Sequence, residues 1–299
     1  MTKPLPIGNP IKGVILVTLA VMLFALADVL TKHLTMLYAV PLVIALRYLV
    51  NLTLLVGALG PKHGRDLFAT QRTLLVVLRG ACLAAASLTM GIALRYMPVG
   101  ETVAIIYIAP ILVMILAATF LGEKVSIAGW VGAAIGFLGV LLIMRPGAGL
   151  DPVGVAFALI NAVFASGYHL LTRVLSKTET TAALLVNTAL VGTVVFGAML
   201  LFTGAGPLPV GWDWAFLLGL GGLATVGHFM FTAAYREAPA SLLAPVNYMH
   251  LVWAGILGWI VFDHAPDGIS MFGMALVAVA GIAVALRAGF AKPQPAEIT

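Results

Sequence analysis

Charged residues are scarce in this chain. Only 9% of its 299 residues are Asp, Glu, Lys or Arg, while 62% are hydrophobic and the mean hydropathy is +1.11. A soluble domain normally carries about a quarter charged residues. This composition excludes a water-soluble globular domain and predicts an integral membrane protein with lipid as its solvent.

Cysteine and metal-ligand motifs are also scarce. The single cysteine, Cys82, lies inside an apolar run and has no second cysteine to pair with. The sequence contains neither CxxC nor HExxH spacing, so we expect no metal and no cofactor. Although the formal charge is +5, no cluster of Lys and Arg alternates with aromatic residues, and we expect no nucleic-acid partner.

Long apolar runs dominate what is present. About 20 apolar residues cross the hydrocarbon core as a helix, and the runs lack the alternation of a membrane barrel. We therefore predict an all-α membrane protein of ten transmembrane helices, with the lipid bilayer as its surroundings. The ten predicted spans are 12–33, 40–59, 73–95, 98–121, 126–144, 153–175, 181–203, 213–236, 239–261 and 268–288.

The loop charges predict the orientation. Eleven Lys and Arg residues fall on one side of the predicted spans and only three on the other, and the basic side normally faces the cytoplasm. We expect both termini in the cytoplasm. The three residues of the outer side are Lys32, Arg95 and Arg145.

The chain repeats itself at a shift of 141 residues. At this shift Gly80 aligns with Gly221 and Tyr107 with Tyr248. We predict two halves, residues 1–150 and 151–299, each with five helices. An odd number of helices turns the second half upside down, and such inverted repeats are typical of transporters that expose a central site to alternate sides.

Several motifs carry a resemblance to a known family. They are Met97–Glu101 (MPVGE), Tyr107–Pro110 (YIAP), Phe120–Lys124 (FLGEK) and a glycine-rich fifth span that contains Gly132, Gly136 and Gly139. Together they resemble the EamA-type members of the drug/metabolite transporter superfamily over nearly the full chain. The second half departs from the pattern, because Asp263–His264 stands where Gly122–Glu123 stands in the first.

The resemblance implies a carrier in the cytoplasmic (inner) membrane that moves small metabolites, often amino acids or related compounds, and commonly exports them. Protons are a candidate coupling ion. A monomer and a homodimer both remain open, and we expect the glycines of the fifth span to pack within one chain.

Interrupted helices provide the first candidate site. Pro110 and Pro245 lie in the equivalent fourth and ninth spans, and paired interruptions mark transport sites. The polar residues beside them present hydroxyl, amide and imidazole groups to a substrate, or alternatively join the helices by hydrogen bonds. These candidate substrate-binding residues are Tyr107, Asn247, Tyr248 and His250.

Charged residues within the spans provide the second candidate site, because an ionisable side chain there needs a partner or a function. Asp28 and Arg47 lie at similar depth on consecutive spans, and Lys32 lies one turn from Asp28. We consider Asp28 a binder of a substrate ammonium or a proton, and Arg47 a binder of a substrate carboxylate. The alternative is a static ion pair between them.

Two histidines and one arginine complete the candidates. His169 occupies the position of Asp28 in the second half, and His228 lies in the eighth span; imidazoles titrate near neutral pH or simply hydrogen-bond to neighbours. Arg79 lies near the cytoplasmic start of the third span, where it acts as an inner gate, pairs structurally or snorkels to the interface.

Two other classes of function compete with a carrier. Ser166–Gly167 with His169 or His228 superficially resembles an intramembrane serine hydrolase, but no oxyanion-hole motif accompanies it. A scaffold or sensor usually has a soluble domain. We therefore predict a non-enzymatic alternating-access exporter, in which spans 1–4 and 6–9 line the cavity and spans 5 and 10 are peripheral.

Overall fold

The computed structural model describes residues 9–109, 112, 116, 119, 127–145, 149–175, 178–237 and 246–290. These residues form ten α-helices and one 3₁₀ turn, and no strand occurs among them. The helices are α1 (Pro10–Leu37), α2 (Val40–His63), α3 (Thr73–Tyr96), α4 (Val99–Ile106), α6 (Ile127–Met144), α7 (Pro152–Leu175), α8 (Thr181–Thr203), α9 (Asp213–Glu237), α11 (Met249–Phe262) and α12 (Gly268–Phe290), with the 3₁₀ turn η1 at Gly64–Leu67.

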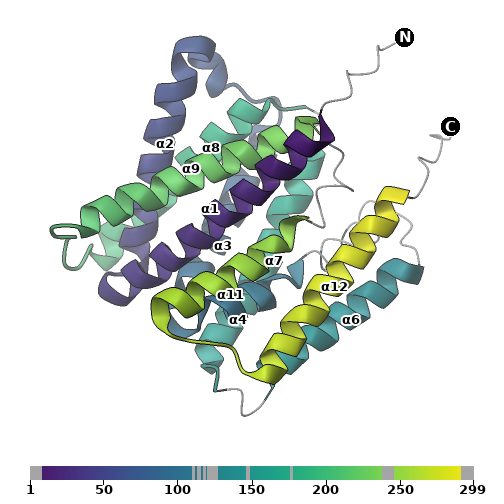
Figure 1. The fold of residues 1–299 in the computed structure, drawn as a ribbon. Helices are drawn as coiled ribbons and strands as arrows, with labels where there is room; N and C mark the ends of the chain where they lie inside the picture. The colour runs from purple at the N-terminus through teal and green to yellow at the C-terminus, as the bar shows by residue number, and fades with distance from the viewer. Residues whose placement is uncertain are drawn as a thin grey trace, which may run out of the picture.

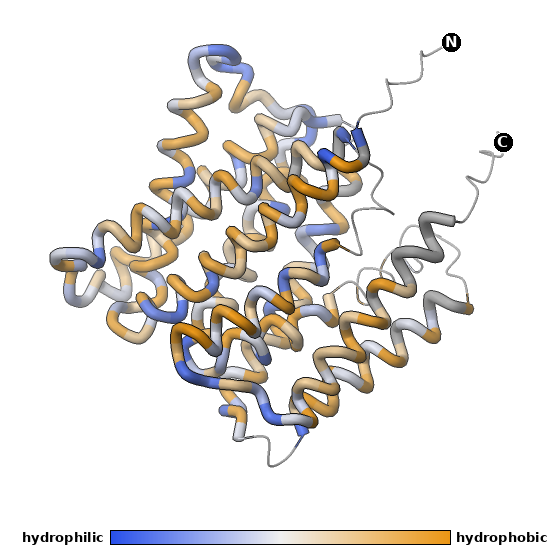
Figure 2. Tube along the Cα trace, in the orientation of Figure 1, coloured by the Kyte–Doolittle hydropathy of each residue, from blue (hydrophilic) through white to orange (hydrophobic). Residues whose placement is uncertain are grey.

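The helices are predominantly apolar. Six are long and apolar enough to cross a membrane, the first having a mean hydropathy of 2.5. Figure 2 shows hydrophobic residues along most of the helices, with polar residues at their ends and at a few positions within them. Large apolar side chains such as Phe202 and Ile260 lie on the outside, as lipid contact requires. The predicted all-α membrane fold is confirmed.

Local sequence explains several helix boundaries. The side chain of Asn9 accepts hydrogen bonds from the first turn of α1, and Pro10 occupies its first position. The carboxylate of Asp151 accepts a 2.7 Å bond from the Val153 amide at the start of α7. Helix α2 stops at Gly64, whose φ of +54° favours glycine.

Helices of the first half pack mainly against helices of the second half. Helix α1 packs against α9 and α11, and its counterpart in the second half, α7, packs against α3 and α4. Three other contacts join counterparts directly, because α2 contacts α8, α4 contacts α11 and α6 contacts α12. The contacts of α2 with α9 and of α3 with α8 are equivalent to each other. Exchanging the halves converts each of these named contacts into another that is present, which is the pattern of an approximate two-fold axis.

Helices α6 and α12 lie side by side at one edge of the molecule (Figure 1). Gly132, Gly136 and Gly139 are all buried in α6. A Cβ added to Gly139 would lie 2.7 Å from the Gly273 carbonyl oxygen of α12, so glycine allows the backbones to approach closely. The glycines of α6 thus pack within the chain, and the pair is peripheral as predicted.

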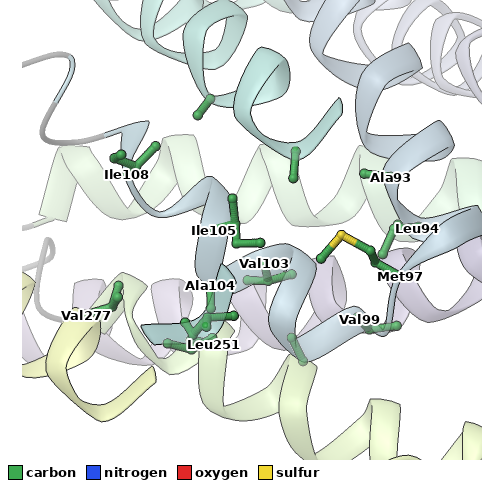
Figure 3. Close-up of a cluster of buried hydrophobic side chains, with 14 of the residues drawn as sticks. Ala93, Leu94, Met97, Val99, Val103, Ala104, Ile105, Ile108, Leu251 and Val277 are labelled. Carbon is green, nitrogen blue, oxygen red and sulfur yellow. The ribbon is translucent and has the colours of Figure 1, made fainter. Parts of the chain in front are cut away.

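Helix α4 lies in the middle of the bundle. Val103, Ala104 and Ile105 are at most 1% exposed, in a cluster that also contains residues of α3, α11 and α12 (Figure 3). Helix α4 ends at Ile106, and α11 begins at Met249. Pro110, Pro245 and Gly122–Glu123 lie outside the described residues.

Candidate functional site

The two equivalent tyrosines meet at the centre of the bundle. Tyr107 follows the last residue of α4, and Tyr248 precedes the first residue of α11. Their ring centroids are 5.0 Å apart. The Tyr107 hydroxyl donates a 2.6 Å hydrogen bond to the Asn247 carbonyl oxygen. Two helix ends from opposite halves are therefore joined through these residues.

His250 connects this tyrosine pair to an acid. Its Nε2 lies 3.0 Å from Asp28 Oδ2, and both side chains are 16% exposed. The His250 ring is 6.1 Å from the Tyr107 ring, measured between centroids. We call Asp28, Tyr107, Asn247, Tyr248 and His250 the acid–tyrosine cluster; sequence reasoning named all five.

The expected pairing of Asp28 with Arg47 is wrong. Asp28 meets His250 of α11, and α1 packs mainly against α9 and α11 rather than against α2. Lys32 does not join Asp28 either: its ammonium donates to the carbonyl oxygens of Leu94 at 2.8 Å and Met97 at 2.7 Å. Tertiary packing thus overrides proximity in the sequence.

Arg47 lines a separate, narrow cavity. The space open to the centre of a water molecule is about 20 Å³, room for about one water. The Arg47 guanidinium lies 5.6 Å from the Tyr48 ring centroid, and Asn51 Oδ1 is buried without a hydrogen-bond partner among the described residues. The described residues of the lining include no carboxylate. We call this the cationic cavity; its polar lining is Arg47, Tyr48, Asn51, Tyr168, Thr188, Thr225 and His228.

Arg79 borders the cationic cavity and does not snorkel. It is 3% exposed and its guanidinium lies 4.4 Å from the Tyr168 ring centroid. All its hydrogen-bond acceptors among the described residues are neutral, so the buried charge is satisfied by hydrogen bonds alone. The acceptors are Tyr168 Oη at 2.9 Å, Thr172 Oγ1 at 2.7 Å, Thr188 Oγ1 at 2.5 Å and the Leu184 carbonyl at 3.1 Å.

The histidines occupy different places. His228 lines the cationic cavity, and its ring centroid is 4.9 Å from that of Phe24. Phe24 also contacts His250 at 6.4 Å, so this ring lies between the cationic cavity and the acid–tyrosine cluster. His169 packs edge-on against Tyr168 at 5.4 Å.

Sequence reasoning missed Phe24, Asn51, Tyr168 and Trp253. Phe24 is one apolar residue among many in its span, and nothing in the sequence distinguishes it. Asn51 and Trp253 are distinguished by buried side-chain atoms that have no hydrogen-bond partner among the described residues, and Asn247 Oδ1 shares this property. In the sequence, Asn51 and Tyr168 are distinguished only by being polar residues within apolar spans.

Ser166 is placed for packing. Its hydroxyl donates to the carbonyl oxygens of Ala162 at 2.6 Å and Ala109 at 3.1 Å, and it is fully buried. Both of these bonds are to backbone carbonyl oxygens, which tie Ser166 into the packing of its helix.

Apolar spans in two repeats, with polar groups buried between them, define a membrane transporter. The chain belongs to the EamA-like transporter family, whose model matches residues 11–145 and again residues 152–287. The family expected from the motifs is therefore confirmed, as is its presence in two repeats.

Named relatives are similar along most of the chain. A riboflavin transporter of Rhizobium johnstonii is 29% identical, covering 92% of this chain and 91% of its own. A pseudopaline exporter of Pseudomonas aeruginosa is 26% identical, covering 91% and 95%. An S-adenosylmethionine uptake transporter of Rickettsia felis is 23% identical, covering 72% of each. A solved crystal structure with 22% identity superposes at a TM-score of 0.66 over 93% of this chain and 97% of its own, which shows a shared fold.

Proposed function

We propose that this protein is an alternating-access carrier that exports small zwitterionic metabolites, such as amino acids or related compounds, across the inner membrane, with both termini in the cytoplasm. The observation that carries the proposal is the placement of opposite charges around Phe24. Asp28 lies in the acid–tyrosine cluster, whose His250 contacts the Phe24 ring. Arg47 lines the cationic cavity, whose His228 contacts the same ring.

A zwitterion complements these two places. An ammonium group binds the Asp28 carboxylate, and a carboxylate binds the Arg47 guanidinium, for which charge-assisted bonds are strongest. The tyrosine and phenylalanine rings hold the apolar part of the substrate. Asn247 Oδ1 is buried and has no hydrogen-bond partner among the described residues, and in this proposal it accepts a hydrogen bond from a substrate amine or hydroxyl.

Alternating access is supported by the exchange symmetry and by ion pairs at both ends of the bundle. Lys12 and Glu237, one from each half, are 2.6 Å apart at one end, and Arg145 and Asp267 are 2.8 Å apart at the other. In an inverted-repeat carrier, opening one end breaks one pair while the other holds.

We propose protons as the coupling ion, with the Asp28–His250 pair as the place where a proton and a substrate ammonium compete. The names of the relatives include both an exporter and an uptake transporter, so transport must be measured in both directions.

The test is reconstitution of the protein in liposomes. Labelled leucine, glutamate, lysine and riboflavin are followed in both directions, with and without a pH gradient. The Asp28→Asn variant should transport about tenfold more slowly, in line with about 1.5 kcal/mol for a charged hydrogen bond, whereas Asp66→Asn, on an exposed turn, should transport normally. If no compound moves in either direction, the carrier proposal fails; if Asp28→Asn transports normally, the site lies elsewhere.

A further inference from the structure

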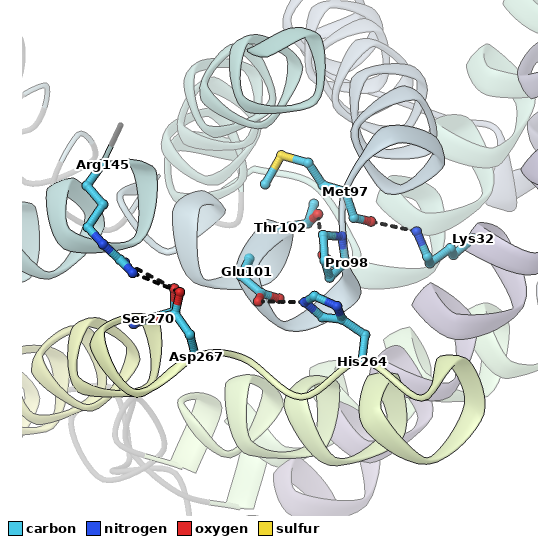
Figure 4. Close-up of polar contacts among 9 residues, drawn as sticks. All are labelled: Lys32, Met97, Pro98, Glu101, Thr102, Arg145, His264, Asp267 and Ser270. Carbon is cyan, nitrogen blue, oxygen red and sulfur yellow. Dashed lines mark hydrogen bonds and ion pairs between the residues drawn. The ribbon is translucent and has the colours of Figure 1, made fainter. Parts of the chain in front are cut away.

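A second pocket opens where α1, α3 and α11 end and α4 begins. The space open to the centre of a water molecule is about 400 Å³, within the range of small-molecule sites. It shares no residue with the acid–tyrosine cluster or with the lining of the cationic cavity. We call it the vestibule; its lining includes Lys32, Met36, Met97, Glu101, Phe262 and His264, several of which Figure 4 shows.

Glu101 is the unusual member of this lining. It lies in the first turn of α4, where a carboxylate favours the helix N-terminus, yet it is only 3% exposed. Its Oε1 accepts a 3.1 Å bond from His264 Nε2 (Figure 4). Its Oε2 is buried and has no hydrogen-bond partner in the described part of the chain. A buried carboxylate oxygen without a donor is costly, so this atom is suited to receive one from a ligand.

Lys32 supplies the opposite charge. Its ammonium donates two hydrogen bonds, to the carbonyl oxygens of Leu94 and Met97. An ammonium has three donors, so beside its two bonds to described residues it can donate one more to a ligand. The same nitrogen lies 5.4 Å from the Phe262 ring centroid. The neighbouring Arg145 and Asp267 neutralise each other at 2.8 Å.

The vestibule therefore has one acidic acceptor, one cationic donor and an apolar wall. We propose that it is a second binding site, for a small amino acid with an apolar side chain. The ligand's ammonium donates to Glu101 Oε2, its carboxylate accepts from Lys32 Nζ, and its side chain packs against Phe262. His264 lies beside Glu101. This inference rests on the proposed function, because it places a second binding site for the same substrate class at one end of the helix bundle.

The experiment measures protection of a cysteine at the vestibule. Met36 lines the pocket and is 57% exposed, so Met36→Cys in a Cys82→Ala background reports access by maleimide labelling of the detergent-purified full chain. The matched control reporter is Leu208→Cys, which is 62% exposed and lies between α8 and α9, outside the vestibule.

Three probes test which groups are recognised. They are L-leucine, 3-methylbutylamine, which lacks the carboxylate, and 4-methylpentanoate, which lacks the ammonium. Leucine should slow labelling of the Met36→Cys reporter at least threefold, the amine should slow it less, and the acid should not slow it. The Leu208→Cys reporter should be unaffected. Equal protection by leucine and 4-methylpentanoate would overturn the role of Glu101.

Two substitutions sharpen the assignment. Glu101→Gln should abolish protection by leucine. Lys32→Gln should remove the preference for leucine over 3-methylbutylamine, which tests the carboxylate side independently if the first variant does not fold. The proposal would be overturned if Glu101→Gln kept the protection by leucine and Lys32→Gln kept the preference for leucine over 3-methylbutylamine.

The experiments distinguish a failure of the proposed vestibule site from a failure of the proposed carrier function. If leucine protects the Met36→Cys reporter while liposomes show no transport of any compound, the vestibule stands and the proposed function falls. If leucine at saturating concentration gives no protection, the vestibule is overturned, whether or not transport is seen. Asp28→Asn, in the acid–tyrosine cluster, should keep the protection.

Discussion

Replacing Gly139 by alanine should separate α6 from α12. The added Cβ would lie 2.7 Å from the Gly273 carbonyl oxygen and 2.9 Å from Val277 Cγ2. Ordinary contact begins at 3.4 Å, so the backbones must move apart by about 0.7 Å (3.4 − 2.7). The obstructing atom is backbone and cannot rotate away. Overpacking of this kind costs about 1–3 kcal/mol of unfolding free energy.

Gly197→Ala is the matched control for that substitution. Gly197 lies in α8, where an added Cβ meets nothing within 4 Å. Alanine there should raise the unfolding free energy by about 0.4–1 kcal/mol, because it reduces the freedom of the unfolded chain. Thermal melting of both variants in detergent, followed by size-exclusion chromatography, gives the comparison. If Gly139→Ala melts at or above Gly197→Ala, the close approach of α6 and α12 is refuted.

Three further predictions concern the polar groups. Asp28→Asn and His250→Gln should each lower transport about tenfold, in line with about 1.5 kcal/mol for a charged hydrogen bond; because they share one bond, additive losses in the double variant would contradict the pairing. Arg79→Lys should lower the unfolding free energy by about 1.5–3 kcal/mol, since lysine has fewer donors than the four bonds require; unchanged melting would count against this network. The Ser270 amide and Arg145 hold the pKa of Asp267 below its ordinary 3.8, so its ionised form stabilises the fold above about pH 4 and this contribution is lost as pH falls through the lowered pKa. Asp267→Asn should therefore flatten that part of the melting profile, and a profile identical to the parent's would exclude the effect.

The sequence by itself determined the class of protein, the positions of the helices and the family. Transfer of an apolar run into lipid depends on the composition of that run alone, so the spans follow from local sequence. The repeat was visible because Gly and Pro mark helix contacts and interruptions at a constant spacing. Tyr107 and Tyr248 were recognisable as site candidates for this reason.

Only the tertiary structure decided which polar groups meet. A span that is apolar on every side has no amphipathic pattern from which its rotation can be inferred, so depth in the membrane suggested Arg47 as the partner of Asp28, whereas the packing of α1 on α9 and α11 places His250 there. The same reason explains the inward turn of Arg79, the position of Phe24 between two polar regions and the burial of Glu101. Each depends on the rotation of one helix against another, which contacts between distant segments determine.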